Sequence, residues 1–364
     1  MSLRQRLIDR TLELIQIPSV TGQEAALGDH LMTLIPQLAP DVSLHRVGSS
    51  VLAFTPSQPG RPTIGLFGHT DTVRPAPDQP VGVFHDRIFG CGASDMKAAL
   101  AVMLELLQEH RGLTRANLVF VFYDKEEGPW VDSGMGPVLE AGLLPPLDLA
   151  LCLEPTDNVI QVGCVGTLHL SATVRGRRAH SARPWQGDNA VTRALPLLQQ
   201  AAAWTPRDVS FGDISFREVM SVTLIEGGTN RNVIPDQVKV NVNFRFAPGR
   251  APEEAVEICK QHLLAGYGDA LPPEGIQFDV IDLAPSGKVY PDEPLLRAWQ
   301  QAEGLRVEPK QAWTDVARLT QLGIPAVNFG PGETAQAHQA RESISIELLV
   351  EGHRLLRALL RSDP

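Results

Sequence analysis

Residues 63–71 read TIGLFGHTD, a short apolar run that ends in a polar triplet. The run is too short for a helix and does not alternate polar with apolar residues, so it predicts a strand covered on both faces. Two similar runs follow, NLVFVFY at 117–123 and LALCL at 149–153, and helical spacing over 96–109 separates the first run from the second. Strands that alternate with helices predict an α/β domain with a mostly parallel sheet and helices on both faces.

The middle of the chain has a different pattern. Residues 237–246, QVKVNVNFRF, alternate polar and apolar side chains, which predicts an antiparallel strand with one exposed face. Further strands near 165–174, 219–225 and 276–282, with helices near 189–203 and 252–264, complete the order β-α-β-β-α-β of a ferredoxin-like unit. We therefore expect a catalytic domain from residues 1–165 and 284–364, and an inserted ferredoxin-like α+β sandwich at 166–283.

The composition narrows the class of protein. The chain has 364 residues, 43% of them hydrophobic, which is enough for two buried cores. Lys and Arg number 32 and Asp and Glu 42, and the net charge of −10 gives no reason to expect nucleic acid or an anionic membrane as a partner. No apolar run has the length of a membrane span and no signal-peptide pattern begins the chain, so we expect a cytoplasmic protein. The four cysteines lack CxxC spacing and are interpreted as reduced thiols, with Cys91 as a small packed hydrophobe.

Polar side chains follow four predicted strands at the point where each strand ends. In chain order they are His69 with Asp71, Glu126 with Glu127, Glu154, and His338 shortly after a strand at 324–329. A fifth carboxylate, Asp95, directly precedes the helix predicted over 96–109. Because ligands bind outside the carboxyl ends of the strands in open α/β sheets, we expect these side chains to converge.

Two histidines and three carboxylates suit a pair of divalent cations such as zinc, with one carboxylate bridging them. Asp71 lies two residues beyond His69 on an extended segment, so it faces the same way and can accept the proton of the second imidazole nitrogen. Of the adjacent Glu126 and Glu127, one can bind metal while the other stays free to act as general base and then general acid.

Each feature alone has a commoner explanation. An H-x-D triplet arises by chance and a Glu-Glu pair is usually a solvated surface, which favours the plain interpretation by about four to one. Taken alone, His180 reads as a loop histidine and Arg245 as a surface residue of an exposed strand. The joint placement of the other residues at consecutive strand ends reverses that weighting.

Five motifs resemble, in order and over essentially the whole chain, those of the M20 family of metallopeptidases and deacylases. They are HTD at 69–71, GCGASDMK at 90–97, EEG at 126–128, EPT at 154–156 and AH at 337–338. Further motifs are similar to those of the succinyl-diaminopimelate desuccinylases, notably the branch known from actinobacteria: GRRAHSARP at 176–184, NVIP at 232–235, NFRFAP at 243–248 and WTD at 313–315. The chain departs from the family where Cys91 stands in place of a common Arg and Ala98 in place of a common Gly.

The resemblance implies a site with two Zn²⁺ ions, for which Co²⁺ can substitute. By similarity, one ion is held by His69, Asp95 and Glu154, and the other by Asp95, Glu127 and His338. The resemblance also implies that Glu126 is the catalytic acid and base and that Asp71 orients His69. It implies that the inserted domain at 166–283 serves as a lid and dimerisation domain, and that His180 reaches the partner's site in the homodimer. It also implies substrate contacts from Asn232 and Arg245.

The implied reaction converts N-succinyl-LL-2,6-diaminopimelate, a small N-acyl amino acid, to succinate and LL-diaminopimelate in lysine and cell-wall biosynthesis. Other M20 activities stay open: an acetylornithine-type deacetylase, an aminoacylase or a di- or carboxypeptidase. A non-catalytic metal-binding protein is a more remote alternative, because binding zinc does not require Glu126. The chain has neither the G-x-S-x-G of a serine hydrolase nor the H-E-x-x-H of a single-zinc protease.

Overall fold

The computed structural model describes residues 1–268 and 275–361. The chain divides into two compact units. The first comprises Met1–Gly163, Lys288–Lys310 and Thr314–Pro364, and the second comprises Cys164–Gly287 and Gln311–Trp313. The three-residue segment joins the second unit through Gln311, whose side chain accepts a hydrogen bond from the backbone nitrogen of Arg217 at 3.0 Å and donates one to its carbonyl oxygen at 3.1 Å.

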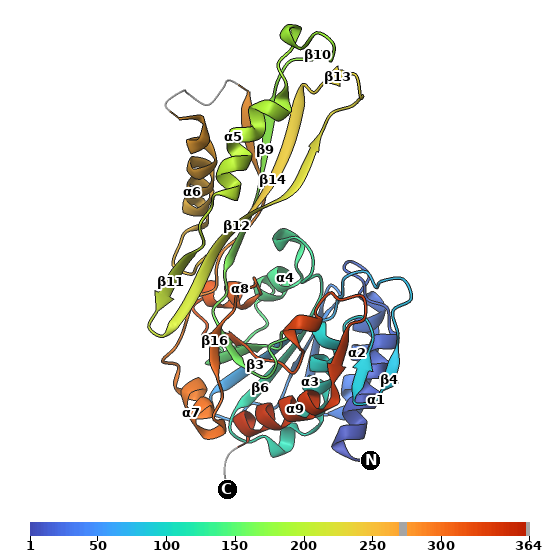
Figure 1. Ribbon diagram of the computed structural model, residues 1–364. Helices are drawn as coiled ribbons and strands as arrows, with labels where there is room; N and C mark the ends of the chain where they lie inside the picture. Colours follow the sequence, from blue (N-terminus) through green and yellow to red (C-terminus); the bar gives the residue numbers. More distant parts are fainter. Residues whose placement is uncertain (269–274, 362–364) are drawn as a thin grey trace. The chain divides into compact units, whose positions relative to one another are not determined.

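The first unit is built on an eight-stranded sheet (Figure 1). In the order in which they pair, its strands are β1 (Ser43–Val47), β2 (Ser50–Phe54), β6 (Asn117–Tyr123), β3 (Thr63–His69), β7 (Leu149–Cys152), β17 (Ala326–Asn328), β8 (Ile160–Val162) and β16 (Val307–Pro309). The central strands β6, β3, β7 and β17 are parallel, which confirms the mostly parallel sheet. The antiparallel β1–β2 pair at one edge was not predicted, because β1 is a short exposed strand without clear alternation.

Helices pack on both faces of this sheet, as expected. On one face lie α1 (Leu3–Gln16), α2 (Ala25–Leu38), α3 (Ala98–Gln108) and α9 (Ile346–Leu360), with α7 (Pro294–Glu303) packed against α9. On the other face, α4 (Met135–Glu140) and α8 (Val316–Gln321) share a core with Phe67 and Val121. A small sheet of β18 (Ser343–Ser345), β5 (Arg87–Phe89) and β4 (Gly82–Phe84) completes the unit. Covering on both sides explains why β3 and β6 are apolar at nearly every position.

The most deeply buried of these helices is α3, with the sequence AALAVMLELLQ. A helix that is apolar nearly all round belongs in the interior. It begins at Ala98, two residues later than the spacing predicted, because a π-helical turn over Ala93–Lys97 precedes it. Asp95 and Met96 have non-helical backbone angles in that turn, and the peptide bond between them is cis. Asp95 therefore lies in an irregular turn that directly precedes the N-terminus of α3.

The second unit has a five-stranded antiparallel sheet (Figure 1). Its order is β11 (Arg207–Phe211), β12 (Ile214–Gly227), β14 (Gln237–Phe246), β9 (Gly166–Arg175) and β15 (Ile276–Ala284). With α5 (Ala190–Ala202) and α6 (Pro252–Leu264) packed on one face, the last four strands form the expected ferredoxin-like arrangement. The edge strand β11 is an addition that the sequence did not indicate. The inward positions of β14 pack against both helices, and its alternate positions lie on the opposite, polar face.

A separate pair of short strands, β10 (Ala179–His180) and β13 (Val233–Ile234), lies in the same unit.

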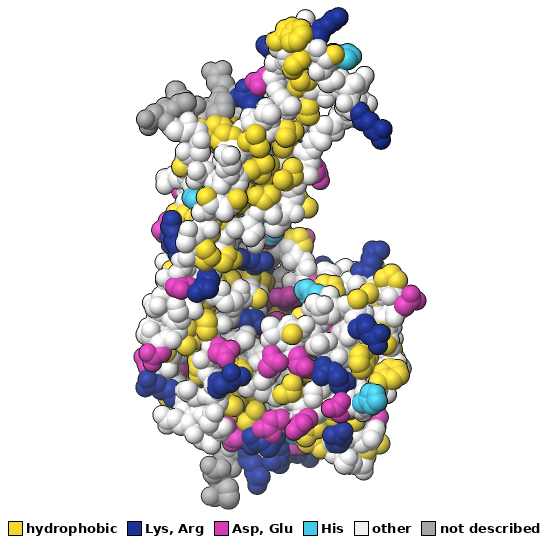
Figure 2. Space-filling model, in the orientation of Figure 1, with side chains coloured by type: hydrophobic (Ala, Val, Ile, Leu, Met, Phe, Trp, Pro, Cys, Tyr) yellow, Lys and Arg dark blue, Asp and Glu magenta, His cyan; other side chains and the backbone are white. Residues whose placement is uncertain are grey.

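No helix in the described part of the chain combines the length and apolar character that crossing a bilayer requires. None of the four cysteines, all of which lie in the described residues, forms a disulfide bond. On the face of the first unit seen in Figure 2, acidic and basic side chains are interspersed, so that face shows no uniformly basic region.

Candidate metal centre

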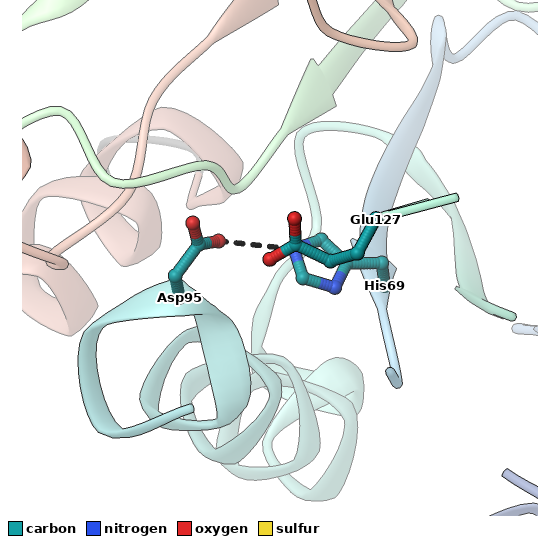
Figure 3. Close-up of side chains that lie close together, drawn as sticks. All are labelled: His69, Asp95 and Glu127. Carbon is teal, nitrogen blue, oxygen red and sulfur yellow. Dashed lines mark hydrogen bonds and ion pairs between the residues drawn. The ribbon is translucent and has the colours of Figure 1, made fainter. Parts of the chain in front are cut away.

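Three side chains from separate parts of the first unit converge on one point (Figure 3). His69 is the last residue of β3, Glu127 follows the end of β6, and Asp95 lies in the turn before α3. Strands β3 and β6 are parallel neighbours in which His69 pairs with Tyr123, so both strands end at the same edge. His69, Asp95 and Glu127 each offer one ligand atom, and these atoms lie within 4.8 Å of one another.

Both remaining predicted ligands adjoin this group. Nε2 of His338 lies 2.8 Å from Oε1 of Glu127 and 3.5 Å from Oδ2 of Asp95. Glu154 follows β7 and is 6% exposed, and the charge of Asp95 acts on its carboxyl group. Its Oε1 is buried without a hydrogen-bond partner among residues 1–268 and 275–361. His338 therefore contacts the group directly, and Glu154 lies close enough to Asp95 for the two charges to interact.

Carboxylates are crowded at this point. Burial, and next the charge of Asp95, raises the pKa of Glu154 to about 7. Burial, and next the charge of Glu154, raises the pKa of Glu126 well above its usual value. The hydrogen bond with Glu127 raises the pKa of His338 to about 9. Buried carboxyl groups close to one another resist ionisation, because their negative charges repel each other away from water. A cation bound between them offsets this repulsion. The donor set and the unpaired Glu154 oxygen therefore fit divalent cations.

Asp71 connects His69 with the adjacent glutamates. Nδ1 of His69 lies 3.0 Å from the backbone carbonyl oxygen of Asp71 and 3.5 Å from its carboxylate. The carboxylate accepts hydrogen bonds from the backbone nitrogens of Glu126 at 2.9 Å and Glu127 at 3.0 Å. It also accepts one from the hydroxyl of Thr21 at 3.0 Å. The side chain expected to orient His69 therefore makes its shorter contacts with the Glu126-Glu127 pair.

The turn that carries Asp95 is held by Glu342, a residue that the sequence analysis missed. The Glu342 carboxylate accepts hydrogen bonds from the backbone nitrogens of Gly92, Ser94 and Asp95 at 2.9, 2.7 and 2.9 Å. Gly332 closes the other side, where a Cβ atom would lie 2.2 Å from the carbonyl oxygen of Ser94. Glu342 is separated from its partners by up to 250 residues, so no local pattern could have indicated it.

Two further residues lie beside the cluster. Lys310 is 6% exposed and donates a hydrogen bond from Nζ to the carbonyl oxygen of Pro155 at 3.2 Å, next to Glu154. Cys91 is half-buried, and its Sγ donates to the carbonyl oxygen of Val73 at 3.3 Å. Burial raises the pKa of the Cys91 thiol, as befits a packed side chain.

The other predicted site residues lie in the second unit. His180 pairs with Val233 between β10 and β13, and the backbone nitrogen of Ser181 donates to the carbonyl oxygen of Asn232 at 2.9 Å. His180 and Asn232 are therefore near neighbours. Nδ1 of the exposed His180 accepts a hydrogen bond from the backbone nitrogen of Ala182 at 3.0 Å. A neutral His180 thus carries its proton on Nε2, which makes that atom a hydrogen-bond donor.

Arg245 lies on the polar face of the second sheet, as the alternation along β14 predicted. It is half-buried, and its Nε donates to Oδ1 of Asn243 at 3.1 Å. Burial lowers the pKa of its guanidinium, which nevertheless stays charged. A charged fork on a half-buried face is suited to bind a carboxylate.

Comparison with known proteins finds similarity over the whole chain. Residues 65–362 match peptidase family M20/M25/M40. The chain is 36% identical over 363 residues to a putative succinyl-diaminopimelate desuccinylase DapE of Mycobacterium tuberculosis, covering 99% of each protein. It is 34% identical to a succinyl-diaminopimelate desuccinylase of Corynebacterium glutamicum, covering 96% of this chain and 95% of that one. The crystal structure of a tripeptidase from Staphylococcus aureus has the same fold, with a TM-score of 0.81 at 23% identity and 98% coverage of each chain.

Proposed function

Because the chain belongs to peptidase family M20/M25/M40, a family of amide-bond hydrolases, we propose that it removes the succinyl group from N-succinyl-LL-2,6-diaminopimelate. The products are succinate and LL-diaminopimelate, which serve lysine and cell-wall biosynthesis. The proposed substrate rests on the 34% and 36% identity with proteins named as desuccinylases over nearly their full length. The proposed chemistry rests on the residues of the first unit.

The observation that carries this proposal is the buried convergence of His69, Asp95 and Glu127, with Glu154 and His338 beside them. Mixed histidine and carboxylate ligands suit zinc, and cobalt can take its place. One zinc ion would be held by His69, Asp95 and Glu154, and a second by Glu127, His338 and the same Asp95. The buried Oε1 of Glu154, which has no hydrogen-bond partner among the described residues, supports this assignment, since a buried carboxylate oxygen requires a partner.

When bound, two divalent cations polarise the scissile carbonyl and lower the pKa of water. Glu126 accepts the proton of the attacking water and delivers it to the amide nitrogen as the C–N bond breaks. The water oxygen becomes part of the new carboxylate, and the nitrogen leaves as an amine. Asp71 supports this role through its hydrogen bond with the backbone nitrogen of Glu126 at 2.9 Å.

The second unit would supply the groups that recognise the substrate. In a homodimer formed through this unit, His180 of one subunit would serve the site of the other. Its Nε2–H would donate a hydrogen bond to the oxyanion of the tetrahedral intermediate. Asn232 would bind the scissile carbonyl and Arg245 a substrate carboxylate, which the planar guanidinium grips through two hydrogen bonds.

Steady-state kinetics on a panel of substrates test the proposal. Protein loaded with zinc should be assayed on N-succinyl-LL-2,6-diaminopimelate, N-acetylornithine, and small di- and tripeptides under one set of conditions. The highest kcat/KM is expected for the succinylated substrate, because its succinyl group carries a carboxylate that an acetyl group lacks and that Arg245 would bind. A higher kcat/KM for another substrate would overturn the substrate assignment and keep the hydrolase assignment.

A peptidase activity is the second candidate. The family is described as a peptidase family, and the tripeptidase structure with a TM-score of 0.81 shares the whole fold. The same two-cation chemistry hydrolyses a peptide bond and an N-succinyl bond alike. Hydrolysis of the di- and tripeptides in the panel, with no turnover of the succinylated substrate, would favour this candidate.

A further inference from the structure

The loop that follows the Glu126-Glu127 pair is held by contacts at its beginning, at Trp130 and at Gly134, whose backbone nitrogen donates to the carbonyl oxygen of Asp124 at 2.8 Å. At its beginning, the carboxylate of Asp71 accepts the backbone N–H groups of both glutamates. The loop continues through the short 3₁₀ helix η3 (Trp130–Asp132) and enters α4 at Met135. Trp130 lies three residues beyond Glu127. The position of Trp130 therefore limits the path of the backbone that follows the two glutamates.

Arg318, from the first turn of α8, contacts Trp130 in two ways. Its NH2 group donates a hydrogen bond to the backbone carbonyl oxygen of Trp130. The centre of its guanidinium lies 3.4 Å from the centroid of the Trp130 ring, the geometry of a stacked cation–π contact. The side chain of Arg318 is only 11% exposed, so these contacts are largely sheltered from water.

The guanidinium of Arg318 is itself held in place by Asp315. Its Nε donates to Oδ1 of Asp315 at 2.7 Å, and the Asp315 side chain is completely buried. The planar fork of an arginine can bond a carboxylate with one nitrogen and a carbonyl with another while it stacks on a ring. The single ammonium of a lysine cannot reproduce all three contacts. The geometry thus requires an arginine at position 318.

We propose that Arg318 is a positioning residue that fixes the loop after Glu127 and thereby the carboxylates of the Glu126-Glu127 pair. This inference rests on the function proposed above, in which Glu126 transfers the proton. A displacement of about 1 Å in a reacting group can reduce turnover by about 100-fold without any loss of substrate binding. Loss of Arg318 should therefore lower kcat much more than it raises KM.

A second effect must be separated from this one, because Arg318 also neutralises a buried carboxylate. Removing Arg318 alone leaves the buried Asp315 without its neighbouring guanidinium, which destabilises the fold. The double variant Asp315→Asn/Arg318→Met removes both charges and keeps the volume of the two side chains. It should fold with near wild-type stability, yet its loop would lack the hydrogen bond and the stacked cation at Trp130.

The experiment compares Arg318→Lys, the double variant, and a matched control, Arg297→Lys. Arg297 lies on α7 and forms an exposed ion pair with Asp292. Amide hydrogen exchange over residues 128–134 and kcat and KM are measured for each zinc-loaded protein. We expect faster exchange in this loop and a kcat about 10–100-fold lower in both Arg318 variants, with KM changed less than about threefold and the control unchanged.

Rescue of Arg318→Ala by added guanidinium ion would support the inference further, because a free guanidinium can occupy the place of the lost side chain. Wild-type exchange and kcat in the double variant would overturn it and would leave Arg318 as a partner of Asp315 only. The exchange measurement needs no substrate. Faster loop exchange in protein that hydrolyses nothing in the panel would therefore refute the proposed function while the role of Arg318 in holding the loop stands.

Discussion

Nδ1 of His69 lies 3.0 Å from the main-chain carbonyl oxygen of Asp71, closer than the 3.5 Å that separates it from the carboxylate of the same residue. A carbonyl oxygen accepts a proton and cannot donate one, so Nδ1 carries the proton and Nε2 is left to bind a cation. Because the acceptor is a main-chain atom, this hydrogen bond does not depend on the side chain of Asp71. The carboxylate of Asp71 can therefore hold the backbone of the Glu126-Glu127 pair instead.

We expect Asp71→Asn to affect Glu126 more than His69. Asparagine keeps one acceptor oxygen, so one of the two hydrogen bonds with the backbone nitrogens of Glu126 and Glu127 is lost. Zinc content should stay near that of the wild type while kcat falls about 10–100-fold, the usual range for such supporting groups. Thr21→Val, which removes the hydroxyl contacts to the Asp71 carboxylate and to the carbonyl oxygen of Thr72, serves as a control and should have a small effect. Loss of zinc from Asp71→Asn would instead assign the orientation of His69 to the carboxylate.

Removal of metal should abolish activity and also lower stability. Without cations, protonated His69 and His338 are left to offset the charges of Asp95 and Glu127, and burial raises the pKa of the nearby Glu154 to about 7. Cations that bind only the folded state stabilise it by about 2.7 kcal/mol at a free concentration 100 times their Kd. Calorimetry of chelated protein should therefore show a lower Tm, which zinc or cobalt restores together with hydrolysis. Full activity in protein shown by elemental analysis to be free of metal would contradict the two-cation assignment.

Substitution of Glu126 should separate metal binding from proton transfer. Glu126→Gln removes the proton acceptor but no proposed ligand, so zinc content and KM should change little. Turnover should fall by about 100-fold to 10,000-fold, the contribution usual for general acid–base catalysis. The exposed Glu140 on α4 offers the same substitution as a control. Near wild-type turnover in Glu126→Gln would show that another group transfers the proton.

The convergence of the predicted ligands followed from features that a sequence displays directly. Short apolar runs marked β3, β6 and β7, and parallel pairing brings the ends of such strands to one edge. His69, Glu127 and Glu154 each lie within a few residues of such an end. Their convergence was therefore a consequence of topology. The second unit was also predictable from a pattern in the sequence. Polar and apolar side chains alternate over the ten residues of β14, as they do in a strand with one buried face.

The groups that hold the ligands in place were not predictable in this way. Glu342 and Arg318 act on backbone atoms of segments that are remote in sequence, and backbone acceptors and donors have no sequence signature. The edge strands β1 and β11 were missed because most of their residues are exposed, so burial imposes no periodicity on them. The start of α3 was placed two residues early, because helical spacing does not distinguish a π-helical turn from regular helix.

Glu342 should be necessary for the affinity of the site. Glu342→Gln retains one acceptor oxygen for the three backbone nitrogens of the Asp95 turn, so at least one N–H loses its partner. Leaving a buried donor unpaired costs about 1–3 kcal/mol, and a loosened Asp95 should weaken zinc binding about 10–100-fold. Competition with a zinc chelator measures the affinity. Glu347→Gln, at an exposed position of α9, is the matched control. Unchanged affinity in Glu342→Gln would mean that the turn keeps its shape without this carboxylate.

Mixing two inactive variants tests whether His180 acts in the site of a partner subunit. In a hybrid dimer of His180→Ala and Glu126→Gln, one site would combine an intact Glu126 from one chain with an intact His180 from the other. Random exchange makes about half of the dimers hybrid, and each hybrid has one complete site, so about a quarter of wild-type activity should return. Mixing His180→Ala with the double variant Glu126→Gln/His180→Ala creates no complete site and should give no recovery. If subunit exchange is demonstrated with labelled chains and the first mixture stays inactive, His180 does not act across a dimer.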